Sequence, residues 1–120
     1  MGEGFLLVNI YARETGRPVE GALVTVYGGG VSLSRKTDAT GRTEKIALPS
    51  PDRKYSLEPQ LRVRPYARYL VKAEKPGLRG VLIDGVQIFD GQTALQNIIM
   101  NPGPQEDFEF IEIPENHLWA

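Results

Sequence analysis

The feature that most constrains this chain is a pair of turn signatures on either side of a short β-branched run. The first is Gly16-Arg17-Pro18-Val19-Glu20-Gly21-Ala22 and the second is Thr37-Asp38-Ala39-Thr40-Gly41-Arg42. Glycine accepts a positive φ, proline presets φ, and aspartate bonds back to its own backbone, so both segments predict tight reversals. Between them, Leu23-Val24-Thr25-Val26-Tyr27 is too short and too β-branched for a helix, and it predicts a strand.

The same pattern continues along most of the chain. Alternating apolar residues separated by Gly, Pro and Asp predict seven strands, the sixth of them interrupted by a bulge at Asp84-Gly85. No segment has a convincing helical period. We therefore predict an all-β fold, a seven-stranded antiparallel β-sandwich within residues 1–101. The predicted strands cover residues 5–12, 23–27, 31–37, 43–48, 66–75, 81–89 and 94–100.

Two segments depart from this pattern. Residues 49–67 form a long Pro-rich flap, in which four prolines oppose a central strand or a long helix. Residues 102–120 form a C-terminal tail, which begins with Pro102-Gly103-Pro104 and carries an alternating apolar stretch. We expect this tail to pack as an extra β-like segment, either on its own sandwich or on a partner. The predicted tail contacts are Phe108, Phe110, Ile113 and Trp119.

Composition excludes several classes of function. Lys and Arg number 14 against 15 Asp and Glu, so the chain has no basic field for nucleic acid. The absence of cysteine excludes disulfides, thiolate zinc sites and a cysteine nucleophile. The apolar stretch from Phe5 to Ile10 follows an acidic residue and is too short for a signal peptide or for membrane insertion. On this basis we expect a cytoplasmic protein.

The motifs resemble a known family. The pattern Gly-x-Pro-Val-x-Gly-Ala-x-Val-x-Val at 16–26, followed by Thr-Asp-x-x-Gly at 37–41, is similar to carboxypeptidase regulatory-like domains, which are transthyretin-type (prealbumin-like) sandwiches. Leu78 replaces the aromatic residue that often ends a later element of that family. Segments 55–59, 64–69, 85–92 and 113–119 resemble domains of spore-forming clostridia, several of them in proteins of the cell wall or spore cortex. The resemblance implies that the chain could belong to such a larger system.

Candidate catalytic groups are few. His117 is the only histidine and lies three residues from the C-terminus, where a tail anchor explains it better than a general base. Transthyretin-like hydrolases of urate breakdown carry several histidines and a C-terminal motif that this chain lacks. Asp84 and Asp90 lie in predicted turns and give only a weak calcium signal, and nothing indicates that Lys72 and Asn97 meet to form an isopeptide bond. We predict no enzyme activity, no cofactor and no metal site.

The flap offers the predicted binding surface. Arginine forks beside tyrosine rings suit sugars, carboxylates or acidic peptides. The alternative is that the tyrosine rings pack and the arginines are solvated. The predicted ligand-binding or partner-binding residues are Arg53, Tyr55, Arg62, Arg64, Tyr66 and Arg68.

Together these features predict a non-catalytic binding or adaptor module, which acts through contacts with a protein partner or a cell-wall glycan. The alternative is a structural spacer or assembly subunit whose C-terminal tail pairs between protomers. A homo-oligomer would then form through the tail or through an edge strand of the sandwich.

Overall fold

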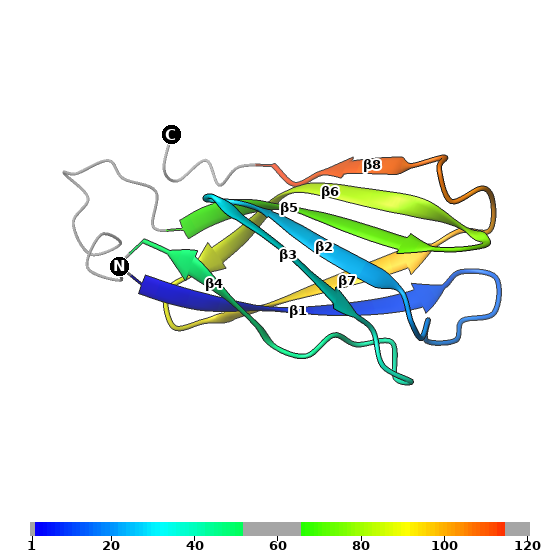
Figure 1. Ribbon diagram of the computed structural model, residues 1–120, viewed down its shortest axis with the longest axis horizontal. Coiled ribbons are helices and arrows are strands. Elements are labelled where there is room, and N and C mark those ends of the chain that lie inside the picture. Colours follow the sequence, from blue (N-terminus) through cyan, green and yellow to red (C-terminus); the bar gives the residue numbers. More distant parts are fainter. Residues whose placement is uncertain (1, 52–65, 115–120) are drawn as a thin grey trace.

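The computed structural model describes residues 2–51 and 66–114 and shows two β-sheets packed face to face (Figure 1). Within these residues there are eight strands and no helix. The three-stranded sheet has the order β4-β1-β7, with β4 at Ile46–Ser50, β1 at Gly2–Ala12 and β7 at Thr93–Met100. The five-stranded sheet has the order β3-β2-β5-β6-β8, with strands at Val31–Lys36, Leu23–Gly28, Tyr66–Lys75, Leu78–Phe89 and Glu109–Glu112.

The predicted β-sandwich is confirmed, and the seven predicted strands correspond to β1 to β7. The eighth strand comes from the tail and lies beside β6. Most neighbouring strands are antiparallel, but β1–β7 and β6–β8 are parallel pairs. Apolar alternation sets which face a side chain occupies and says nothing about the direction of the neighbouring strand, so the sequence did not predict these parallel pairs.

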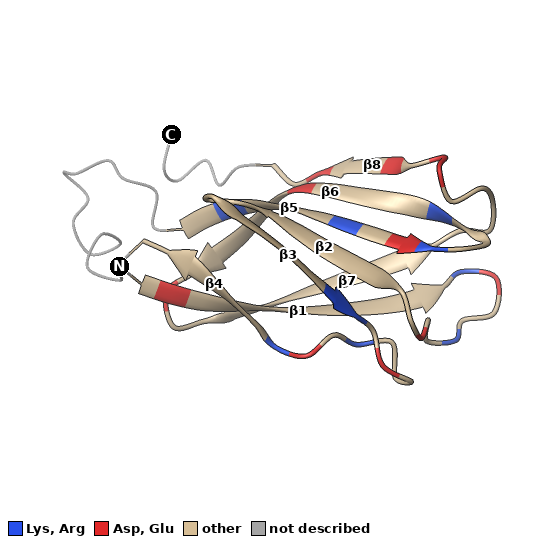
Figure 2. Ribbon diagram, in the orientation of Figure 1, with Lys and Arg blue, Asp and Glu red and all other residues tan. Residues whose placement is uncertain are grey.

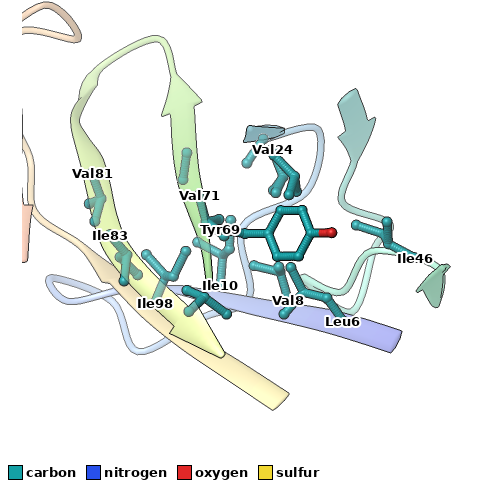
Figure 3. Packing of buried hydrophobic residues seen from close by; sticks show 14 of the residues in the cluster. Leu6, Val8, Ile10, Val24, Ile46, Tyr69, Val71, Val81, Ile83 and Ile98 are labelled. Carbon is teal, nitrogen blue, oxygen red and sulfur yellow. The ribbon is translucent and has the colours of Figure 1, made fainter. Parts of the chain in front are cut away.

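The core lies between the two sheets and is built mainly from branched aliphatic side chains (Figure 3). Leu6, Val8 and Ile10 on β1 are fully buried and face β-branched residues of the other sheet. Tyr69 extends from β5 into this core, and its Oη donates a hydrogen bond to the Pro49 carbonyl at 2.6 Å. Burial raises the pKa of the Tyr69 hydroxyl. Other members of the core are Val24, Val26, Ile46, Leu48, Val71, Val81, Ile83, Val86, Ile88, Ile98 and Met100.

Asp38 holds the second turn signature together. Its Oδ1 accepts hydrogen bonds from the Thr40 hydroxyl at 2.6 Å and from the backbone N–H groups of Thr40 and Arg42 at 2.8 and 3.2 Å. The bond from the Thr40 hydroxyl, followed by the two backbone bonds, lowers the pKa of the Asp38 carboxyl. The aspartate therefore has the turn role that the sequence predicted.

Thr37 links the two turn signatures. Its buried Oγ1 donates to the Val19 carbonyl at 2.6 Å and accepts from the Ala22 N–H at 2.9 Å. The donor and acceptor capacities of this hydroxyl are both used. Two backbone bonds add to the link, because the Gly21 N–H donates to the Thr37 carbonyl at 2.9 Å and the Thr37 N–H donates to the Ala22 carbonyl at 3.0 Å.

The predicted bulge lies at Gly85. Tyr69 pairs with Val86, and Leu70 pairs with Asp84, so Gly85 is the extra residue on β6. Its φ of +94° favours glycine. A Cβ at this position would also lie 2.8 Å from the Ile113 carbonyl oxygen. The bulge therefore leaves room for the backbone of the tail to approach β6.

Candidate binding surface

The described residues include only two members of the predicted flap site. Arg53, Tyr55, Arg62 and Arg64 lie outside these residues, as do Trp119 and His117 of the tail. Tyr66 begins β5 and is only 2% exposed, with its ring 5.3 Å from that of Phe89. Its burial leaves almost no ring surface for a ligand and matches the alternative of core packing. The half-buried Arg68 contacts the tail, where its Nη2 lies 3.5 Å from the Ile113 carbonyl oxygen.

The tail reaches its own sandwich through Phe108 and Ile113. The Phe108 ring covers Gly80 of β6, and the Lys72 ammonium lies 5.3 Å from the ring centroid. The Ile113 N–H donates to the Asp84 carbonyl at 2.8 Å, and its side chain packs against the core. Phe110, by contrast, is 61% exposed. The described part of the tail is therefore anchored at both ends of β8, with an exposed ring between the anchors.

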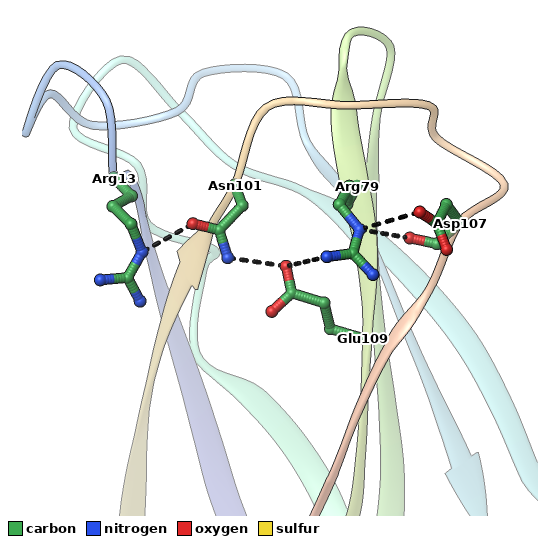
Figure 4. A network of polar contacts seen from close by, with 5 residues as sticks. All are labelled: Arg13, Arg79, Asn101, Asp107 and Glu109. Carbon is green, nitrogen blue, oxygen red and sulfur yellow. Dashed lines mark hydrogen bonds and ion pairs between the residues drawn. The ribbon is translucent and has the colours of Figure 1, made fainter.

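A polar network holds the segment between β7 and β8 (Figure 4). Arg79 Nε lies 3.2 Å from both the carbonyl oxygen and Oδ2 of Asp107, and its Nη1 lies 3.7 Å from Glu109 Oε2. Asn101 Nδ2 donates to the same Glu109 oxygen at 2.7 Å, and Arg13 Nε donates to Asn101 Oδ1 at 2.6 Å. These contacts join the ends of β1 and β7 to the starts of β6 and β8, so we assign them a structural role.

The sequence analysis did not predict a binding surface on the outer face of the three-stranded sheet. Since Leu6, Val8 and Ile10 point into the core, the alternate residues of β1 point outward. The register places the outward side chains of β7 directly beside those of β1. We call this surface the β1–β7 face, and it consists of Phe5, Leu7, Asn9, Tyr11, Leu95, Asn97 and Ile99.

This face is exposed and apolar. The side chains of Leu95 and Ile99 are 60% and 50% exposed, although each stands in a regular strand. Each has an apolar neighbour on β1, because Leu95 pairs with Leu7 and Ile99 pairs with Tyr11. Scattered exposed apolar residues are ordinary on proteins, but a contiguous group of them marks an interaction surface.

The strands of the three-stranded sheet carry little charge. Glu3, at the start of β1, is the only charged residue in β1, β4 and β7, and Figure 2 shows β7 without any charged position. The five-stranded sheet carries charges on four of its strands, at Arg35, Lys36, Arg68, Lys72, Glu74, Lys75, Arg79, Asp84, Glu109 and Glu112. The two outer faces of the sandwich therefore suit partners of different chemistry.

Two amides lie at the centre of the β1–β7 face. Asn9 is 6% exposed, and its Nδ2 lies 3.3 Å from both Asn97 Oδ1 and Tyr11 Oη. Asn9 Oδ1 is buried and accepts no hydrogen bond from any described residue. Buried amide oxygens are normally paired, so this acceptor is an exception beneath the face.

The other groups that the sequence singled out have local partners. Asp90 Oδ1 accepts a hydrogen bond from the Glu3 N–H at 3.2 Å, and Lys72 forms an ion pair with Glu74 at 3.5 Å. Asn97 contacts Asn9 of its own sheet, whereas Lys72 lies in the other sheet. Over residues 2–51 and 66–114 there is no group of three acidic or histidine side chains placed to hold a metal ion. In the same residues no helix is long and apolar enough to cross a membrane.

No protein-family model matches the chain, and no curated protein matches it in sequence. Among solved structures it is similar to the Bacillus anthracis TIE protein, with 15% identity and a TM-score of 0.62 over 85% of this chain and 17% of that one. It is also similar to GBS52, the minor pilin of Streptococcus agalactiae, with 14% identity and a TM-score of 0.58 over 96% of this chain and 49% of that one.

A third similar structure is the 5-hydroxyisourate hydrolase of Klebsiella pneumoniae, with 24% identity and a TM-score of 0.56 over 82% of this chain and 91% of that one. The chain thus spans about a sixth of the TIE protein and half of the pilin. At these identities the likeness concerns the fold, which is a transthyretin-like β-sandwich shared by enzymes and by binding or structural modules.

Proposed function

We propose that this chain is a non-catalytic module that binds another protein through the β1–β7 face. The observation that carries the proposal is the exposure of Leu95 and Ile99 on β7, an edge strand without a charged residue. Fully burying such a side chain stabilises a complex by roughly 1.5–3 kcal/mol, so covering these two half-exposed side chains contributes about 1–2 kcal/mol each. Their neighbours Leu7 and Tyr11 extend the same apolar surface.

The setting we propose is a cell-wall or spore-associated system. The chain would be a domain of that system, of the carboxypeptidase regulatory-like type that the sequence motifs resemble. The minor pilin among the similar structures is compatible with this setting. The flap residues other than the buried Tyr66 remain the proposed contact for a wall glycan. β1 and β7 carry no Lys or Arg that could bind a carboxylate, although the Lys45 ammonium lies 4.7 Å from the centroid of the Phe5 ring. We assign the protein contact to the face for this reason.

Retention on clostridial cell-wall fragments tests this proposal. One portion of the fragments is treated with protease before the purified chain is added, and bound chain is measured after sedimentation. We expect retention on untreated fragments, and we expect it to be lost after protease treatment and in Leu7→Lys. The control is Ser32→Asp, which adds a charge at an exposed position of β3 on the opposite sheet.

The outcome of this test distinguishes protein binding by the β1–β7 face from glycan binding by the flap. Retention that survives protease and is lost on mutating Arg68 would assign binding to glycan and to the flap. Retention of Leu7→Lys equal to that of the wild type would contradict the role of the face.

A second candidate function rests on β8. Phe110 and Ile111 are 61% and 47% exposed at consecutive positions, so they lie on opposite faces of this short edge strand. They favour an assembly subunit whose tail also contacts another protomer. Replacing both residues with Asp would then lower the sedimentation coefficient at high protein concentration, and an unchanged value would remove this candidate.

A further inference from the structure

The free edge of β7 has the geometry to accept another strand. The carbonyls of Gln92 and Met100 accept hydrogen bonds from the Phe5 and Arg13 N–H groups. Successive residues of a strand direct their backbone groups to opposite sides, so even-numbered positions of β7 bond to β1. The N–H and C=O groups of residues 93, 95, 97 and 99 therefore point away from the sheet.

The same odd-numbered positions carry the exposed side chains of β7. Leu95, Asn97 and Ile99 all lie on the β1–β7 face. A strand added at this edge would thus gain backbone hydrogen bonds and side-chain contacts from the same residues. Edge strands with these properties are the sites where chains pair with one another.

The four edge strands of the sandwich differ in how they discourage such pairing. β3 carries Arg35 and Lys36, β8 carries Glu109 and Glu112, and β4 carries Pro49. Charge and proline are the usual protections of an edge strand. β7 reads Thr-Ala-Leu-Gln-Asn-Ile-Ile-Met and has neither.

We propose that a second copy of this chain pairs with this edge, antiparallel, with a two-fold axis at Asn97. The proposal rests on the proposed role of the β1–β7 face in protein binding and names a partner for its edge. In this register Asn97 lies opposite its own copy, and Leu95 lies opposite Ile99 of the other copy. Residues 95, 97 and 99 each form a hydrogen-bonded pair, and each such pair exchanges two backbone bonds.

Charge and register favour a second copy as the occupant. β7 has no charged residue, so two copies bring no like charges together. A two-fold interface requires a self-complementary surface, and the Asn97-centred register sets amide against amide and apolar side chain against apolar side chain. A shift by two residues would place Leu95 against Asn97 and would lose this match.

One contact within the chain opposes the pairing. Gln96 Nε2 donates to the Asn97 carbonyl at 3.0 Å, and this carbonyl points to the free edge. The interface is also small, and small interfaces are typical of transient association. We therefore expect a dimer that forms as concentration rises and not a permanent one.

Disulfide cross-linking tests the register. Because the native chain has no cysteine, an introduced cysteine can pair only with its own copy. Paired residues in an antiparallel hydrogen-bonded position have Cα atoms about 5.5 Å apart, within the range of a disulfide. In Asn97→Cys the two sulfurs therefore meet across the axis. In Leu95→Cys, the matched control on the same edge and face, the two positions are four residues apart, about 13 Å. We expect disulfide dimers of Asn97→Cys under mild oxidation, and none of Leu95→Cys.

Sedimentation equilibrium provides a second test of the dimer. Leu95→Asp and Ile99→Lys change exposed side chains, and each should weaken dimerisation by at least about tenfold. An equimolar mixture of the two variants should dimerise again. The introduced carboxylate of one copy then faces the introduced ammonium of the other, and the unchanged Leu95 and Ile99 meet at the second contact. Equal cross-linking of both cysteine variants, or a wild-type chain that stays monomeric at millimolar concentration, would overturn the proposal.

The two proposals fail separately. If Leu7→Lys abolishes retention on cell-wall fragments while the wild type stays monomeric, the protein-binding function stands and the dimer is wrong. If the cysteine variants report the dimer while retention is absent, the dimer stands and the wall-protein function is wrong.

Discussion

Gly80→Ala should release the tail from the sandwich. A Cβ at Gly80 would overlap the Phe108 ring, and the three atoms nearest to that Cβ all belong to the ring. Moving the ring would forfeit its partial burial, about half of the roughly 1.5–3 kcal/mol of a fully buried side chain. It would also forfeit the cation–π contact with Lys72, about 0.5–1 kcal/mol. We therefore expect Gly80→Ala to lower the free energy of unfolding by about 1.5–2.5 kcal/mol.

A double-mutant cycle isolates this effect. Urea denaturation gives the free energy of unfolding of the wild type, Gly80→Ala, Phe108→Ala and the double variant. Once the ring is absent, alanine within β6 should be better than glycine by about 0.5–1 kcal/mol. The sign of the Gly80→Ala effect should thus reverse in the Phe108→Ala background. Equal destabilisation in both backgrounds would refute the account of how Phe108 anchors the tail.

Three further changes test the turns and the core. Thr37→Val removes a buried hydroxyl that bonds two backbone groups, and thermal denaturation should show a loss of about 1–3 kcal/mol because both groups lose their partner. The folded pKa of Asp38 is lowered, so its contribution is present above the unfolded pKa and is lost as pH falls through the folded pKa. In Asp38→Asn that acid-dependent part of the unfolding free energy should disappear. The folded pKa of Tyr69 is raised above its ordinary value of 10.0, so stability should fall as pH rises above that value. Tyr69→Phe should lack this fall, and ultraviolet titration of the phenol would contradict the account if Tyr69 ionised with the exposed tyrosines.

Local chemistry explains why much of the fold could be predicted. Asp38 acts within its own turn and Gly85 within its own bulge, so the sequence alone indicates this reversal and this bulge. The parallel pairing of β1 with β7 depends instead on contacts between residues far apart in the chain. Period-two alternation does not contain that information.

The binding surface was harder to predict for a similar reason. Alternation along the first strand places Leu6, Val8 and Ile10 on one face, but the opposite positions Phe5, Leu7 and Tyr11 are also apolar. A strand that is apolar on both faces predicts cover on both faces, and the run from Leu95 to Met100 carries the same signal in β7. The arginines and tyrosines of the flap form a recognisable binding pattern in the sequence, whereas an uncharged apolar surface has no such pattern.

The measurement that most directly tests the central claim is hydrogen–deuterium exchange of the chain, free and bound to untreated cell-wall fragments. The N–H groups of residues 95, 97 and 99 point away from β1 and should exchange readily in the free chain at low concentration. We predict that binding slows exchange in peptides covering residues 93–100, while peptides covering β3 are unchanged. Protection confined to residues 52–65, with none in β7, would contradict the assignment of binding to the β1–β7 face.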